Sequence, residues 1–146
     1  MPLTHILLVE DESLTRELMA ESLNDAGYDV TATCTGDEAA ILLADRDRFD
    51  ALLTDVTLPG SIDGIGLAEH ARELHPRLPV LIVSGMAASQ QRAAALDPPT
   101  AYMLKPFEMN TLLAAVSRLI ETDMIEGGMI EGGIIEGGTI EAGSLT

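Results

Sequence analysis

The sequence predicts an α/β fold in which helices cover both faces of one parallel sheet. Short apolar runs alternate with segments of helical periodicity, which is the pattern of repeated strand–helix units. The 146 residues are enough for one well-buried core and too few for two ordinary domains. We therefore expect five strand–helix units, with strands at about residues 5–10, 28–33, 50–54, 79–83 and 100–104.

The first predicted helix has an apolar stripe and a clear end. Gly27 follows it, and glycine is the usual residue just past the carboxyl end of a helix. The apolar side chains that we expect to face the core recur at helical spacing: Leu14, Leu18, Met19, Leu23 and Ala26.

The second and third predicted helices are recognised by their first residues. Thr35 and Glu38 form the pattern of a capping box, in which each satisfies a free amide of the other. Asp63 is placed to cap the third helix, which ends before Pro76. The residues of this helix that we expect to be apolar contacts of the core are Leu67, Ala68, Ala71 and Leu74.

The last two predicted helices differ in how firmly they can pack. The fourth, residues 87–96, consists mostly of small residues, and few of its side chains can anchor it. The fifth has a full apolar stripe, which we assign to the core: Met109, Leu112, Leu113, Val116 and Ile120.

Chemically active side chains follow four of the five predicted strands. Glu10 and Asp11 come after the first, Asp55 after the third, Ser84 after the fourth and Lys105 after the fifth. The carboxyl ends of parallel strands meet at one edge of a sheet, so we expect a common cleft there, without arginines. Three carboxylates so close together need a neutralising charge, and a hard divalent cation supplies it. The sequence therefore predicts a magnesium site.

These residues and their neighbours resemble the receiver domains of bacterial two-component response regulators. The resemblance covers about residues 4–121 and depends on five motifs in this order: Glu10-Asp11, the run Leu53 to Gly60 with Asp63-Gly64 after it, Ser84-Gly85, Tyr102 and Lys105-Pro106-Phe107. It implies a flavodoxin-like (βα)₅ doubly wound parallel sheet in the strand order 2-1-3-4-5. It also implies signal transduction by phosphoryl transfer, with a sensor histidine kinase or a histidine phosphotransfer protein as donor.

The resemblance also implies a role for each acid. Asp55 would be the phosphoacceptor. Asp11, Asp55 and the backbone carbonyl of Thr57 would ligate Mg²⁺, and Glu10 would act mainly through a bound water. Aspartate is commoner than glutamate at the position of Glu10, and the additional methylene suits this outer role.

The same resemblance implies how a signal would leave the site. Lys105, aimed by a cis peptide bond to Pro106, would contact the phosphoryl oxygens, and Ser84 would donate a hydrogen bond to them. Movement of Ser84 would vacate space that Tyr102 fills by turning inward. The surface of the fourth helix, fifth strand and fifth helix would then change, and a downstream protein would bind there.

Composition excludes several other classes of protein. The formal net charge of −16 opposes direct binding to nucleic acid. No apolar run approaches the roughly 18 residues of a membrane span, and acids stand where a signal peptide would continue apolar. We therefore expect a cytoplasmic protein without membrane association. Cys34 is the only cysteine, so no disulfide is expected, and we interpret it as a buried structural thiol.

Residues 122–146 differ in kind from the predicted receiver domain, residues 1–121. They contain four successive pentapeptides, three with Ile-Glu-Gly-Gly and the last with Ile-Glu-Ala-Gly, and a period of five matches neither a helix nor a strand. Two interpretations stay open: a solvated acidic tail, or short strands that stack and make a homo-oligomer. Because no output domain is recognised after residue 121, we expect a stand-alone receiver of the chemotaxis-regulator type, although its pathway, whether chemotaxis, stress signalling or a phosphorelay, is not indicated.

Three other functions are alternatives to a phosphorylated receiver, which is not itself expected to be an enzyme. A degenerate receiver could act as an adaptor independent of phosphorylation. A flavodoxin-like electron carrier shares the fold, but Glu10-Asp11-Glu12 would repel a flavin phosphate. A magnesium-dependent phosphatase of the haloacid-dehalogenase type would need its nucleophile after the first strand, whereas Asp55 follows the third.

Overall fold

Five parallel strands form a single sheet in the order β2-β1-β3-β4-β5. The computed structural model describes residues 3–45 and 48–126. Each strand boundary lies within one residue of its predicted position: β1 His5–Val9, β2 Asp29–Thr33, β3 Ala51–Asp55, β4 Val80–Ser84 and β5 Thr100–Leu104. The expected (βα)₅ fold and its strand order are confirmed.

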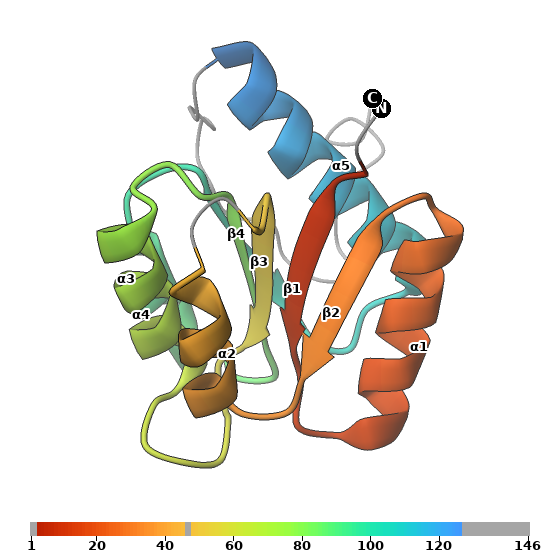
Figure 1. The fold of residues 1–146 in the computed structure, drawn as a ribbon. Helices are drawn as coiled ribbons and strands as arrows, with labels where there is room; N and C mark the ends of the chain where they lie inside the picture. The colour runs from red at the N-terminus through yellow and green to blue at the C-terminus, as the bar shows by residue number, and fades with distance from the viewer. Residues whose placement is uncertain (1–2, 46–47, 127–146) are drawn as a thin grey trace.

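Helices cover both faces of this sheet, with α1 and α5 on one face and α2, α3 and α4 on the other (Figure 1). Their bounds are α1 Ser13–Asp25, α2 Gly36–Leu43, α3 Gly64–Leu74, α4 Gln90–Ala94 and α5 Met109–Glu126, and a short 3₁₀ turn, Ala87–Ser89, precedes α4.

The period of two along each strand divides the core between the two faces. In β1, Ile6 and Leu8 pack with α1 and α5, whereas Leu7 and Val9 pack with α2 and α3, and all four are fully buried. The central strands are therefore apolar on both sides, and the polar side chains of β3 and β4, which are Thr54, Asp55 and Ser84, lie at the carboxyl ends of these strands.

The predicted helix starts are present in the structure. The Thr35 hydroxyl accepts a hydrogen bond from the Glu38 amide at 3.1 Å, and a carboxylate oxygen of Asp63 accepts one from the Gly66 amide at 2.8 Å. At α1 the cap is Glu12, whose carboxylate accepts the Thr15 amide, a cap that the sequence analysis does not anticipate.

The predicted inward face of α1 is partly wrong. Met19 and Leu23 are fully buried, but Leu14 and Leu18 are 64% and 48% exposed, and Ala26 is exposed too. Because consecutive residues are rotated by about 100° around a helix, Leu18 points away from the face of its neighbour Met19, and Leu14, four residues before Leu18, lies on the same outer face. Apolar spacing identified the helix but not its rotation about its own axis.

Two further expectations fail at the ends of elements. Cys34 is exposed, because β2 ends at Thr33 and is an edge strand of the sheet. Leu74, the last residue of α3, is 38% exposed, since it lies where the helix leaves the sheet.

The fourth helix is shorter and less regular than the predicted range 87–96. A 3₁₀ turn occupies 87–89 and only 90–94 are α-helical, with Ala93 as the buried residue of α4. No side chain caps the start of either piece.

The fifth helix continues through Glu126, past the boundary at residue 121 that separates the predicted receiver domain from the tail. The remaining pentapeptides lie outside the described residues, so both interpretations of the tail stay predictions. Within the described residues, no helix is long and apolar enough to cross a membrane.

Candidate functional site

Three carboxylates meet at the carboxyl edge of the sheet, as predicted. Glu10 and Asp11 directly follow β1, and Asp55 is the last residue of the adjacent strand β3. One carboxylate oxygen from each lies within 4.8 Å of those of the other two. Glu10 and Asp55 are buried, whereas Asp11 is exposed, so the cluster opens to solvent on the Asp11 side.

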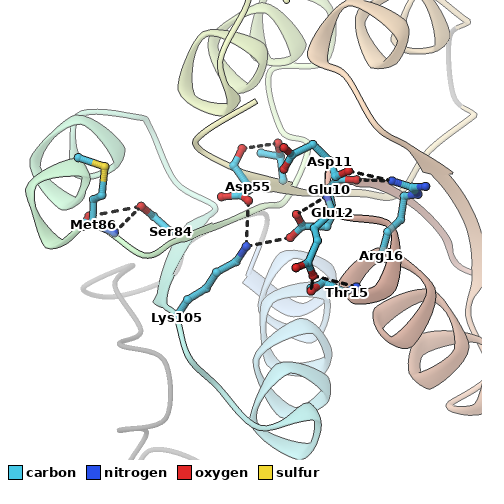
Figure 2. A network of polar contacts seen from close by, with 10 residues as sticks. Glu10, Asp11, Glu12, Thr15, Arg16, Asp55, Ser84, Met86 and Lys105 are labelled. Atoms are coloured by element: carbon cyan, nitrogen blue, oxygen red, sulfur yellow. Dashed lines mark hydrogen bonds and ion pairs between the residues drawn. The ribbon is translucent and has the colours of Figure 1, made fainter. Parts of the chain in front are cut away.

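Lys105 bridges two of these acids. Its ammonium nitrogen lies 2.9 Å from Glu10 Oε1 and 2.9 Å from Asp55 Oδ2, and Figure 2 shows it between them. The residue follows β5, and its amide donates to the Ser84 carbonyl at 2.7 Å. The peptide bond to Pro106 is cis, as expected.

Burial and pairing act in opposite directions on the pKa values of this pair. Burial raises the pKa of the Glu10 carboxyl, and the hydrogen bonds from Lys105 and the Glu12 amide only partly offset it. Burial would lower the pKa of Lys105, but its hydrogen bonds to Asp55 and Glu10 outweigh that and the net shift is upward. Lys105 is therefore a cation at neutral pH, held against the acids.

An arginine stands beside the acids, contrary to the expectation of a cleft without one. Arg16 in α1 donates from Nη1 to the backbone carbonyl of Glu10 at 2.9 Å and to that of Asp11 at 3.4 Å (Figure 2). It supports the backbone of the acid pair rather than pairing with their carboxylates. Only its place in the first turn of α1, five residues after Asp11, could have indicated this role.

Gly64 is a second residue whose role the sequence analysis missed. It begins α3, its amide donates to the Val56 carbonyl at 2.8 Å, and a Cβ atom there would lie 1.8 Å from the backbone oxygen of Asp55. No side chain fits in that space. Gly64 therefore allows α3 to pack directly against the backbone of Asp55.

Ser84 and Tyr102 lie together, but away from the acids. Ser84 Oγ accepts the Met86 amide at 3.0 Å and lies 3.4 Å from the Met86 carbonyl, so it points along its own loop (Figure 2). The Tyr102 hydroxyl donates to the same carbonyl at 2.6 Å, and Tyr102 is fully buried. The inward position that the sequence analysis expects after phosphorylation is thus already occupied by Tyr102.

Thr57, whose backbone carbonyl is the fourth expected metal ligand, is exposed in the loop between β3 and α3. The face formed by α4, β5 and α5 lies at the β5 edge of the sheet, next to Ser84 and Lys105. Met86, between β4 and the 3₁₀ turn that precedes α4, is 57% exposed.

The donor set suits a hard cation. Oxygens that share one magnesium at 2.0–2.1 Å are separated by up to about 4.2 Å, so a spread of 4.8 Å needs only small side-chain adjustments or a bridging water. Because Glu10 carries the salt bridge to Lys105, its position favours a water-mediated contact. The three carboxylates therefore fit magnesium.

Comparisons with known proteins agree on one family. A family model described as "Response regulator receiver domain" matches residues 6–117. Response regulator MprA of Mycobacterium leprae is 36% identical over 116 residues, which are 79% of this chain and 50% of the relative. The chain thus spans about half the length of this curated relative.

Solved structures are similar too. A response regulator receiver protein from Sinorhizobium medicae is 34% identical with a TM-score of 0.75, covering 82% of this chain and 95% of that one. A CheY-like response regulator receiver domain protein from Methanospirillum hungatei is 26% identical with a TM-score of 0.79, covering 86% and 100%.

Proposed function

The chain belongs to the response regulator receiver domain family of two-component signalling systems, and we propose that it accepts a phosphoryl group on Asp55 and transmits its presence through altered protein contacts. This family is a signalling domain rather than an enzyme family. The proposal has two parts: the phosphoryl transfer to Asp55, and the response of the protein to it.

The observation that carries the proposal is the environment of Asp55. Asp55 is the last residue of the central strand β3, and its carboxylate lies 2.9 Å from the Lys105 ammonium. Its carboxylate oxygen also lies within 4.8 Å of oxygens of Glu10 and Asp11, the acids that follow β1. A cation on one side and ligands for a second cation on the other are what an anionic nucleophile needs to approach an anionic phosphoryl group.

In the proposed reaction, a carboxylate oxygen of Asp55 attacks the phosphorus of a phosphohistidine on the donor protein. An O–P bond forms, the P–N bond breaks, and the imidazole leaves with the electron pair and takes up a proton. Acetyl phosphate can replace the donor, with acetate as the leaving group. The partner would be a sensor histidine kinase or a histidine phosphotransfer protein.

Asp11, Asp55 and the Thr57 carbonyl would hold magnesium, and Glu10 would act through a bound water. Magnesium, when bound, supplies charge neutralisation at the phosphoryl oxygens. Lys105 has three ammonium protons, of which two are directed at Glu10 and Asp55. Its position thus lets it add a contact to a phosphoryl oxygen on Asp55 without leaving the site.

The response is proposed to begin at Ser84. For its hydroxyl to reach a phosphoryl group on Asp55, it has to leave the Met86 amide and carbonyl, and that loop leads directly into α4. Because Tyr102 is already buried, we propose that it holds the Met86 carbonyl while Ser84 turns, instead of turning inward itself. A downstream protein would bind the face of α4, β5 and α5.

The proposal is tested with acetyl phosphate and Mg²⁺, with the mass of the intact protein as readout. One phosphoryl group should be added to the natural protein, none to Asp55→Asn, and very little to Asp11→Ala or in EDTA. Asp50→Asn is the matched control, because Asp50 precedes the same strand at its opposite end. Undiminished labelling of Asp55→Asn would overturn the assignment.

One observation favours a second candidate, a receiver that acts as an adaptor without phosphorylation. Tyr102 occupies its inward position while Ser84 is still bound to Met86, so this position does not require a phosphoryl group. An adaptor would bind its partner equally well as natural protein, as phosphorylated protein and as Asp55→Asn. Affinity that changes with phosphorylation in the natural protein alone would exclude it.

A further inference from the structure

The loop that follows the phosphoacceptor is closed at its base. Val56 follows β3, and residues 57–63 form the loop between it and α3; the Gly64 amide donates to the Val56 carbonyl at 2.8 Å, which joins the two ends of this loop. Thr57, with the carbonyl proposed to hold magnesium, is the first residue of this loop. Whatever fixes the path of the loop therefore also fixes that carbonyl.

The tip of the loop is held by one carboxylate from another helix. Asp37, in the first turn of α2, accepts the Ser61 hydroxyl at 2.7 Å with one oxygen and the Ser61 amide at 3.2 Å with the other. These two hydrogen bonds lower the pKa of Asp37. One residue of the loop is thus bound at both its side chain and its backbone.

Two glycines make this close approach possible. Gly60 has a φ of +96°, and a Cβ there would lie 2.8 Å from Asp37 Oδ2. On the other side, a Cβ on Gly36 would lie 2.6 Å from Ile62 Cγ2 and 2.8 Å from the Ile62 carbonyl oxygen. The start of α2 and the loop tip therefore fit together without space for side chains between them.

Stabilisation of the start of α2 does not by itself explain the contact between Asp37 and Ser61. An acid in the first turn of a helix is favourable wherever its side chain points, and Glu38 supplies that charge as well. Within the described residues, no hydrogen bond joins the Glu38 carboxylate to the loop, whereas both oxygens of Asp37 bind Ser61. The direction of the Asp37 carboxylate is thus specific to the loop.

We propose that Asp37 is a positioning residue that holds the 57–63 loop in the path needed for magnesium binding. This inference rests on the proposed function. A loop that is already ordered loses less conformational entropy when its carbonyl binds a cation. Leu58 and Ile62 also pack against the core, so removal of Asp37 should weaken magnesium binding and not abolish it.

The experiment compares Asp37→Ala with Glu38→Ala, which removes one acid from the same helical turn. Magnesium binding, followed by NMR titration without a phosphodonor, should weaken about fivefold in Asp37→Ala, which is the lower end of what the loss of two hydrogen bonds can cost. Amide exchange of Ser61 in the metal-free protein should become faster. Glu38→Ala should change neither quantity.

Two further variants separate positioning from folding. Ser61→Ala removes the 2.7 Å hydrogen bond without touching α2, and should give a smaller change in the same direction. Asp37→Asn retains an acceptor oxygen and should recover part of the affinity. Once magnesium is saturating, the rate of labelling by acetyl phosphate should be the same in all these variants and in the natural protein.

The outcomes distinguish this inference from the proposed function. If the natural protein binds no magnesium and takes no phosphoryl group, the proposed function fails. If it binds magnesium and both Asp37→Ala and Ser61→Ala bind equally well, only the positioning role is overturned. An equal loss of magnesium affinity in Glu38→Ala would also overturn it, because the effect would then come from the negative charge of the first turn of α2 and not from the contact with Ser61.

Discussion

The neighbouring helices α3 and α4 cover the same face of the sheet but are held very differently. α3 is capped by Asp63, starts with a glycine packed on the backbone of Asp55, and buries five of its eleven residues. α4 has five residues, of which Ala93 is buried, and no side chain caps it. α3, which packs beside Asp55, is therefore firmly placed, while α4, the helix proposed to respond, is weakly packed.

The two helices are also connected. Arg92 of α4 lies 3.0 Å from Asp63, the residue that caps α3. The small side chains of the fourth helix predict few anchors, and this ion pair is one of them. Because both side chains are more than a third exposed, the pair restrains α4 only weakly. A weak restraint suits the shift that we propose for α4.

The largest expected effect on stability comes from disturbing α3, the firmly packed helix. Gly64→Ala places a Cβ 1.8 Å from the Asp55 backbone oxygen, so α3 or β3 must move, and unfolding free energy should fall by about 2 kcal/mol or more. Gly85→Ala, at the start of the loop to α4, meets nothing within 4 Å and should change little. Denaturant unfolding of both variants measures the difference. Equal losses would contradict the contrast between the two regions.

An intermediate effect is expected where the two helices meet. Burial alone would raise the pKa of Asp63, but hydrogen bonds from the Gly66 amide and Arg92 outweigh it and the pKa is lowered. A lowered carboxyl pKa in the folded state stabilises the protein above about pH 4 and loses that contribution as pH falls through the folded value. Asp63→Ala should therefore cost about 1 kcal/mol at pH 7, where the cap and the ion pair are both lost.

The same variant tests the pH dependence. At a pH below the folded pKa of Asp63, the difference in unfolding free energy between the natural protein and Asp63→Ala should shrink, because the protonated side chain has lost its ion pair. Thermal unfolding of both proteins from pH 7 to pH 3 follows this change. A difference that stays constant would show that charge at Asp63 contributes nothing.

The smallest expected effect on stability concerns α4, the weakly packed helix. Arg92→Ala should lower the unfolding free energy by no more than about 0.5 kcal/mol, because the ion pair is exposed. It should nevertheless accelerate amide exchange in residues 87–95 and leave exchange in α3 unchanged. Arg77→Ala, an exposed arginine in the turn after α3, is the control. Faster exchange in α3 as well would mean that the two helices open together.

Periodicity and strand-end chemistry in the sequence determined most of the fold and of the candidate site. Five apolar runs and their polar ends were enough to predict the sheet and the meeting of Glu10, Asp11, Asp55 and Lys105, and resemblance to a family supplied the strand order. This succeeds because strand direction alone decides which edge of a parallel sheet a residue reaches.

Tertiary structure alone decided the contacts between elements. The rotation of α1 exposes Leu14 and Leu18, and the position of Arg16 against two backbone carbonyls follows from the same packing. Tyr102 lies inward and Asp37 reaches Ser61 because neighbouring elements approach closely there. Sequence spacing encodes which residues share a face of one element. How that face is turned, and how near the next backbone comes, depends on side chains far away in the chain.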